Sequence, residues 1–183
     1  WKDHTPTEEA GTINSLIHRS HPNYLSRIGS VYSAEWYWSK VLHCLHVDPE
    51  LFDETYTWIE ITDYLLFLLS GKTHIDEATR NISAASHKAL YDEERGGYPP
   101  LSFLGELDER LIPLGRSLHR SAVQPCDRRS GNLSGEWAKR LGLQEGITLA
   151  TGALDAHFGA LGAGVGAGTL VKIVGTSSCD LTV

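Results

Sequence analysis

Residues 148–168, TLATGALDAHFGALGAGVGAG, contain a single acidic residue, Asp155, among glycines and small apolar side chains. The overlapping segment GITLATGA has the pattern of a buried strand, and DAHFGALGAG predicts a helix that begins at Asp155. Ligands of open α/β sheets bind outside the carboxyl ends of strands, where such a helix begins. The helix dipole stabilises an ionised carboxylate there, and adjacent glycines let a substrate approach the backbone. Asp155 is therefore either a proton acceptor for a substrate hydroxyl or an ordinary helix cap.

The segment after this helix, GTLVKIVGTSSCDLTV, predicts two strands, 169–174 and 179–183, around a tight turn. The turn contains Gly175, Thr176 and Ser177, whose N–H and hydroxyl groups can hold phosphate oxygens. An ordinary hairpin turn has the same composition, so both interpretations stay open. The glycines before the turn fit neither GxGxxG nor GxxxxGK[ST], which excludes the Rossmann and Walker fingerprints.

Helices are expected to dominate the chain before residue 142. Thr7 is expected to cap the first of them, Asp48-Pro49 to end the second, and Gly71 to close an apolar third. Asn132 or Ser134 is expected to cap a short last helix that Gly142 ends. The predicted ranges are 5–19, 33–46, 55–71 and the segment just before Gly142. Between the last two, DEATRNISAASHKALYDEERGG predicts a helix or a loop and a helix, and YPPLSFLGELDERLIPLG predicts a short helix between prolines.

Composition sets the class of protein. The chain has 183 residues, 41% of them apolar and 21% charged, which suits a globular domain with a packed core. A net charge of −7 with scattered basic residues argues against a nucleic-acid or membrane-surface partner. Three separated cysteines without a CxxC motif predict reduced thiols and a cytoplasmic protein. The absence of methionine and a last segment with a strand pattern lead us to expect part of a longer protein.

Lys88 is the second candidate for a binding role. It lies in SAASHKAL, where small neighbours would let a lysine reach into a cleft and donate to a sugar hydroxyl or a phosphate. A solvated helix lysine is the alternative interpretation. His87 and His157 lie close to the two candidates in the sequence, and they are expected to contact the candidates rather than the substrate.

Metal-binding and hydrolase motifs are not found. The pairs His18/His21 and His43/His46 have helical spacing, but neither an HExxH motif nor a second ligand pair accompanies them, so no metal site is expected in the chain itself. A G-x-S-x-G nucleophile elbow is also absent, which gives a serine hydrolase no support.

Five segments occur together in an order and spacing that resemble the carbohydrate kinases of the FGGY family. They are WKDHT, YSAEWYWSKVLH, AASHKALYDEERGG, GALDAHFGALGAG and GTLVKIVGTSSCD. WKDH, HKAL and GTSSCD are most similar to the branch that acts on L-ribulose. The resemblance implies an α/β protein with part of the actin-like, ribonuclease H-like ATPase fold. Residues 1–164 would be the later part of the sugar-binding N-terminal domain, and 165–183 the beginning of the ATP-binding C-terminal domain.

The resemblance also implies an activity: ATP-dependent phosphorylation of a pentulose, with L-ribulose converted to L-ribulose 5-phosphate in arabinose catabolism. ATP and Mg²⁺ would be the cofactors, a small sugar the partner, and a homo-oligomer is a possible assembly. Ser86 departs from the glycine usual in the branch. The implied site residues are Asp155 as catalytic base, Lys88 and Trp1 as sugar contacts, and Gly175, Thr176 and Ser177 as a phosphate-binding turn.

Two alternatives remain at this point. The chain can come from another sugar or polyol kinase of the same family. It can also be a catalytically incomplete sugar-binding fragment, because the first phosphate-binding hairpin and the adenosine-binding part of the family are missing from this sequence. Alone, this part of the enzyme is expected to be inactive.

Overall fold

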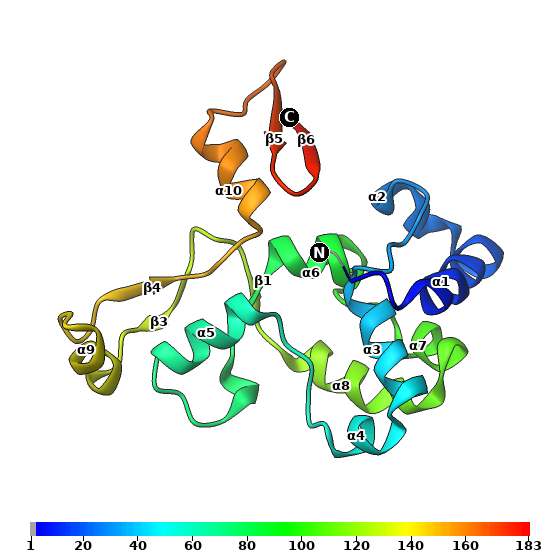
Figure 1. The fold of residues 1–183 in the computed structure, drawn as a ribbon, viewed down its shortest axis with the longest axis horizontal. Helices are drawn as coiled ribbons and strands as arrows, with labels where there is room; N and C mark the ends of the chain where they lie inside the picture. The colour runs from blue at the N-terminus through cyan, green and yellow to red at the C-terminus, as the bar shows by residue number, and fades with distance from the viewer. Residues whose placement is uncertain (1–2) are drawn as a thin grey trace.

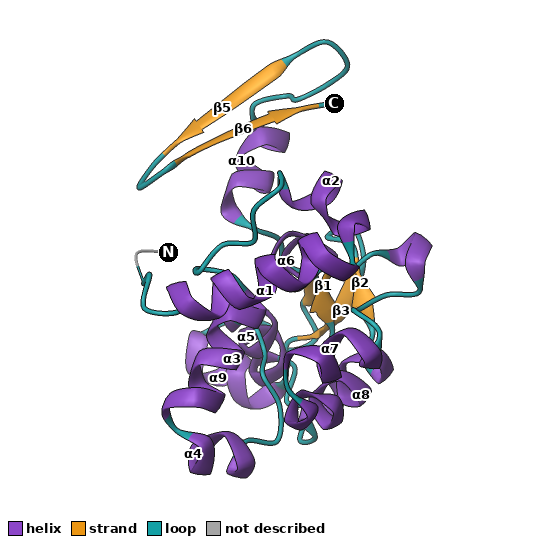
Figure 2. Cartoon of the chain, turned by 90° about the vertical axis from the view of Figure 1, so that its right-hand side faces the viewer, coloured by secondary structure: helices purple, strands orange, loops and turns teal. Residues whose placement is uncertain are grey.

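The fold described here is that of a computed structural model, which describes residues 3–183. A helical part comes first along the chain, and a helix with a β-hairpin projects from it (Figures 1 and 2). The α-helices of the first part are α1 (Thr7–Ser20), α2 (Leu25–Ile28), α3 (Tyr37–Val47), α4 (Pro49–Glu54), α5 (Ile61–Leu69), α6 (Ile82–Ala89), α7 (Leu101–Leu107) and α8 (Ile112–Arg120). Short 3-10 turns occupy Pro22–Tyr24, Ile75–Glu77, Glu93–Arg95 and Glu109–Leu111.

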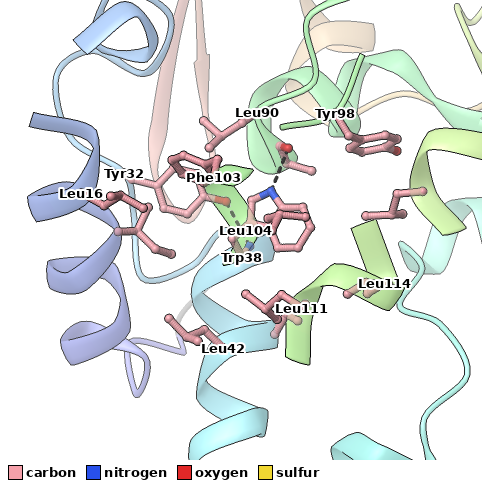
Figure 3. Packing of buried hydrophobic residues seen from close by; sticks show 14 of the residues in the cluster. Leu16, Tyr32, Trp38, Leu42, Leu90, Tyr98, Phe103, Leu104, Leu111 and Leu114 are labelled. Carbon is pink, nitrogen blue, oxygen red and sulfur yellow. Dashed lines mark hydrogen bonds between the residues drawn. The ribbon is translucent and has the colours of Figure 1, made fainter. Parts of the chain in front are cut away.

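These helices pack around one apolar core, part of which is drawn in Figure 3. Ile13, Leu16 and Ile17 form the apolar stripe of α1, which is buried against α3. Trp38 lies at the centre and is fully buried, with Phe103 of α7 in the same cluster. The core therefore lies among α1, α3, α7 and α8, and α6 closes it on the side that faces the projecting hairpin (Figure 1).

The strands form three separate pairs. β1 (Arg80–Asn81) runs parallel to β2 (Val123–Gln124), and β3 (Arg129–Asn132) pairs antiparallel with β4 (Thr148–Ala150), with α9 (Gly135–Leu141) between them. β5 (Leu170–Val174) and β6 (Ser178–Thr182) form the antiparallel hairpin, in which Leu170 faces Thr182 and Val174 faces Ser178. The two strands expected at the end of the chain are thus present, with the predicted turn between them.

The hairpin packs on α10 (Asp155–Gly162). Gly159 permits this contact, because a Cβ atom there would lie 3.0 Å from Ile173 Cδ1 of β5, closer than side chains normally pack. Gly164 and Gly168, in the connection from α10 to the hairpin, have φ angles of 79° and 76°, which favour glycine. The small residues of the sequence therefore serve close packing and a tight connection.

Local signals predicted several helix ends correctly. Ser134 caps α9 by accepting a hydrogen bond from the Trp137 N–H, and Gly142 ends α9 in the left-handed region. Gly71 follows α5 with a φ of 69°. α10 begins at Asp155, as expected.

Four expectations were wrong in detail. Thr7 does not cap α1, because Pro6 is the capping residue and the Thr7 hydroxyl donates to the His4 carbonyl over 2.6 Å. α3 begins at Tyr37 rather than near residue 33, since the Ser33 carbonyl accepts from the Trp36 N–H and forms a turn instead. Residues 55–60 are extended rather than helical. β4 is half-exposed rather than buried.

None of the helices within residues 3–183 combines the length and the apolar character needed to cross a lipid bilayer.

Candidate active site

Helix α6 is held in place at its N-terminus by a buried polar pair. Asn81 caps the helix by accepting a hydrogen bond from the Ala84 N–H over 2.7 Å. Asp63 of α5 accepts from the Asn81 backbone N–H over 3.1 Å and from its side-chain amide over 2.8 Å. Both side chains are almost completely buried, so this pair joins α5 to α6 without help from water.

The C-terminus of α6 is held by the apolar core. The Trp38 indole N–H donates to the Ala89 carbonyl over 2.9 Å, and the Tyr32 hydroxyl donates to the Lys88 carbonyl. Figure 3 shows the Trp38 indole pointing at this end of the helix. These bonds satisfy carbonyls that a helix end leaves without an intrahelical partner, and they fix the backbone from which the Lys88 side chain extends.

The extended segment before α5 forms one wall of the site. The Trp58 carbonyl accepts from the Tyr37 hydroxyl over 3.0 Å and from the buried Arg80 guanidinium over 2.8 Å. Arg80 also donates to Thr57 Oγ1 over 3.2 Å. This wall brings Glu60 to Lys88, with 3.1 Å between the carboxylate oxygen and Nζ.

Asp155 is exposed at the beginning of α10. Leu154 is the capping residue and Asp155 the first helical residue, and the structure records no side-chain cap bond at this end. The interpretation of Asp155 as an ordinary helix cap therefore does not hold. Its carboxylate lies where the helix dipole favours negative charge.

Asp155 and Lys88 line the same groove, which has a volume of about 660 Å³. Its walls are largely apolar and include Tyr37, Trp58 and Phe158. The structure thus brings together two candidates, residues 88 and 155, that lie 67 positions apart in the sequence. A largely apolar groove with a few charged groups suits a small polar molecule with an apolar face. Among residues 3–183, the charged residues that line the groove are Glu35, Lys40, Glu60, Lys88 and Asp155.

The phosphate-binding candidates are not part of this groove. Gly175, Thr176 and Ser177 form the exposed turn between β5 and β6, at the free end of the projecting hairpin (Figure 2). The Gly175 N–H donates to the Ser177 carbonyl over 2.9 Å, which stabilises the turn. The hydroxyls of Thr176 and Ser177 are on the surface and suit phosphate oxygens.

The chain is similar in sequence to known sugar kinases. A ribulokinase from Vibrio parahaemolyticus is 40% identical over 182 residues, which cover 99% of this chain and 32% of that protein. A ribulokinase from Shouchella clausii is 35% identical over 99% of this chain and 31% of that protein. Over nearly its whole length, the chain is therefore similar to ribulokinases. It spans about a third of the length of the curated relatives it matches.

Solved structures show the FGGY fold independently. A xylulose kinase from Bifidobacterium adolescentis superposes with a TM-score of 0.76 at 19% identity, covering 98% of this chain and 41% of that one. A ligand-bound xylulose kinase from Lactobacillus acidophilus gives 0.74 at 17% identity, covering 98% and 34%. The chain therefore has part of the actin-like ATPase fold of these kinases. No family model matches the chain.

The remaining candidates have different outcomes. Trp1 lies outside the described residues. Ser86 is exposed on α6, so its departure from glycine introduces no clash into the groove. His43 and His46 lie within 3.1 and 3.0 Å of the Glu9 carboxylate, but within residues 3–183 no group of three or more His, Cys, Asp or Glu is arranged to hold a metal ion.

Sequence reasoning missed Glu60, Ser83 and the pair formed by Asp63 and Asn81. Asn81 carried a signal, because an asparagine just before an apolar helical segment is a preferred cap. No local sequence signal indicated the roles of Glu60 and Asp63, since their partners lie 28 and 18 positions away in the sequence.

Proposed function

We propose that this chain is the sugar-binding and proton-accepting part of an ATP-dependent pentulose kinase whose preferred substrate is L-ribulose. The observation that carries the proposal is the exposed carboxylate of Asp155 in the groove that Lys88 also lines. The similarity to ribulokinases extends over 99% of the chain, which supports L-ribulose over other sugars.

The groove suggests how each group acts. The sugar would lie against the apolar walls, and Lys88, oriented by Glu60, would donate to one of its hydroxyls. Asp155 would accept the proton of the terminal hydroxyl as that oxygen attacks. ATP, when bound, supplies the phosphoryl group. The protein's contribution to phosphoryl transfer is mainly positioning and neutralisation of charge, so a fixed carboxylate and a fixed amine are what the reaction needs.

The second part of the proposal concerns domains. Residues 1–164 would belong to the sugar-binding domain and 165–183 to the ATP-binding domain. The glycines at 164 and 168 support a boundary in this connection, because both have positive φ angles. The turn of Gly175, Thr176 and Ser177 would then contact the phosphates of ATP as the two domains close and exclude water. We place the enzyme in the cytoplasm, where its reduced cysteines would be stable.

A substrate panel on the complete enzyme tests the proposal. With ATP and Mg²⁺ supplied, L-ribulose is expected to give the highest kcat/KM, ahead of D-xylulose and glycerol. A clear preference for D-xylulose would favour another kinase of the family, a possibility that the xylulose-kinase structures keep open. Sugar binding without phosphorylation of any substrate would instead favour a non-catalytic sugar-binding protein.

Lys88→Met in the complete enzyme is expected to raise the KM for L-ribulose about 10- to 100-fold, with a smaller change in kcat. The reason is that a charged hydrogen bond to the sugar is lost in both the ground state and the transition state. Steady-state kinetics over a range of sugar concentrations measure this split. Lys139→Met, on the exposed surface of α9, is the matched control and should behave like the wild type. An unchanged KM in Lys88→Met would remove the lysine from the sugar site.

A further inference from the structure

The N-terminus of α10 lacks a side-chain cap of its own, because its capping residue is Leu154. A side chain from α6 instead accepts a hydrogen bond from one backbone N–H at this end. Ser83 of α6 accepts a hydrogen bond from the Leu154 N–H over 2.9 Å, across 71 positions of sequence. The same Ser83 oxygen lies 2.7 Å from Nδ1 of His157, one helical turn into α10. Leu154 and His157 stand on either side of Asp155, so Ser83 holds the turn that carries the candidate base.

The direction of the second bond is set by the tautomer of His157. Burial lowers the pKa of His157, and the nearby Asp155 carboxylate opposes that change in the pKa without reversing it. The imidazole is therefore neutral at pH 7, and one ring nitrogen accepts. The Ser83 oxygen already accepts from Leu154, and the Ser83 hydroxyl donates to Nδ1 in the tautomer of His157 that leaves Nδ1 without a proton. His157 then carries its own proton on Nε2.

The surroundings of His157 favour this neutral state. The His87 ring of α6 packs edge-on against it, with 5.9 Å between ring centroids, and Lys88 follows on the same helix. The pKa of His87 is also lowered, by burial first and then by His157 and Lys88. Asp155 is the acidic neighbour on α10 itself. A protonated His157 would place a second cation beside Lys88 and could no longer accept the Ser83 proton.

We propose that Ser83 and His157 are positioning residues that fix the Asp155 carboxylate relative to Lys88. The proposal rests on the proposed function of Asp155. Ser83 and Lys88 lie on the same helix, whose two ends are tied to Asp63 of α5 and to the core. The two hydrogen bonds of Ser83 therefore set where the proton acceptor stands relative to the amine in the groove. Loss of the Ser83 hydroxyl would leave Asp155 present but poorly placed, and misplacement of a catalytic group by about 1 Å can cost about 10²-fold in rate.

The test uses the complete enzyme with L-ribulose, ATP and Mg²⁺. Ser83→Ala is expected to lower kcat about 10- to 100-fold while the KM for L-ribulose changes by less than about threefold. Ser83→Thr keeps a hydroxyl and is expected to restore most of kcat. Ser86→Ala, an exposed serine on the same helix, is the matched control and should behave like the wild type. An unchanged kcat in Ser83→Ala, or a rise in KM as large as the fall in kcat, would overturn the proposal.

A double-mutant cycle tests the pair and does not depend on the threonine fitting. His157→Leu removes the acceptor, and the Ser83→Ala/His157→Leu double variant is expected to be no slower than the slower single variant, because both act through one contact. Effects that multiply would show independent structural damage and overturn the proposal. Asp155→Asn distinguishes a failure of the positioning role from a failure of the proposed function. If that variant is inactive while Ser83→Ala keeps the wild-type kcat, only the positioning role fails; if Asp155→Asn keeps its activity, the proposed function fails as well.

Discussion

Asp155→Asn in the complete enzyme is expected to lower kcat about 10²- to 10⁴-fold, while the Kd for L-ribulose changes by less than about threefold. Asparagine has nearly the same size and shape as aspartate, so the groove keeps its form. Its amide cannot accept a proton from the attacking hydroxyl at neutral pH. The loss corresponds to about 3 to 5 kcal/mol of transition-state stabilisation.

Two measurements are needed for this variant. Calorimetric titration with L-ribulose reports sugar binding, and single-turnover kinetics with ATP report the chemical step. Asp127→Asn is the matched control, because that carboxylate is exposed on a loop and does not line the groove. Turnover near the wild-type rate in Asp155→Asn would show that another group accepts the proton. A loss of sugar binding equal to the loss of rate would make Asp155 a binding residue instead.

The helix that begins at Asp155 could be predicted because its signals are local. A strand pattern, a short polar interruption and a run of small residues lie within about twenty positions of one another. The same holds for the β5–β6 hairpin and for α9, where Ser134 and Gly142 mark the two ends. Capping and turn preferences depend on a few neighbouring residues, and the sequence displays those directly.

The partners across the groove could not be predicted in the same way. Lys88 was a candidate, but the sequence did not indicate that Glu60 would pair with it. The contact depends on Arg80 and Tyr37 holding the Trp58 carbonyl, which places Glu60 at the end of a fixed wall. Each of these bonds joins segments that are far apart in the chain. The late beginning of α3 has a local cause instead, because the Ser33 carbonyl accepts from the nearby Trp36 N–H and Ser39 hydroxyl and forms a turn there.

Asp63→Ala is expected to lower the free energy of unfolding by about 2 to 5 kcal/mol. The alanine removes an acceptor from two buried donors, the backbone N–H and the side-chain amide of Asn81. Asn81 in turn caps α6, which carries both Ser83 and Lys88. The same variant is therefore expected to weaken sugar binding, although Asp63 is not among the residues that line the large groove. Urea unfolding followed by tryptophan fluorescence, together with the KM for L-ribulose, measures both effects.

Asp63→Asn is the discriminating control. Its amide oxygen can accept the same two hydrogen bonds without burial of a charge, so it is expected to cost less than about 1.5 kcal/mol at pH 7. Burial raises the pKa of Asp63 above its ordinary value of 3.8, although the two bonds from Asn81 act in the opposite direction. A carboxyl with a higher pKa in the folded state binds its proton more tightly when folded. Its contribution to stability is therefore full below pH 3.8 and is lost as the pH rises through the folded-state pKa.

Wild type and Asp63→Asn should consequently differ in their pH dependence. Between pH 3.8 and the folded-state pKa, the wild type is expected to lose stability relative to Asp63→Asn as the pH rises, because the asparagine does not titrate. Urea midpoints of the two proteins, measured side by side from pH 4 to 7, give this difference directly. Parallel curves would show that Asp63 is not desolvated as its burial implies. Equal destabilisation in the alanine and asparagine variants would show that the carboxylate oxygen is not what holds Asn81 at the beginning of α6.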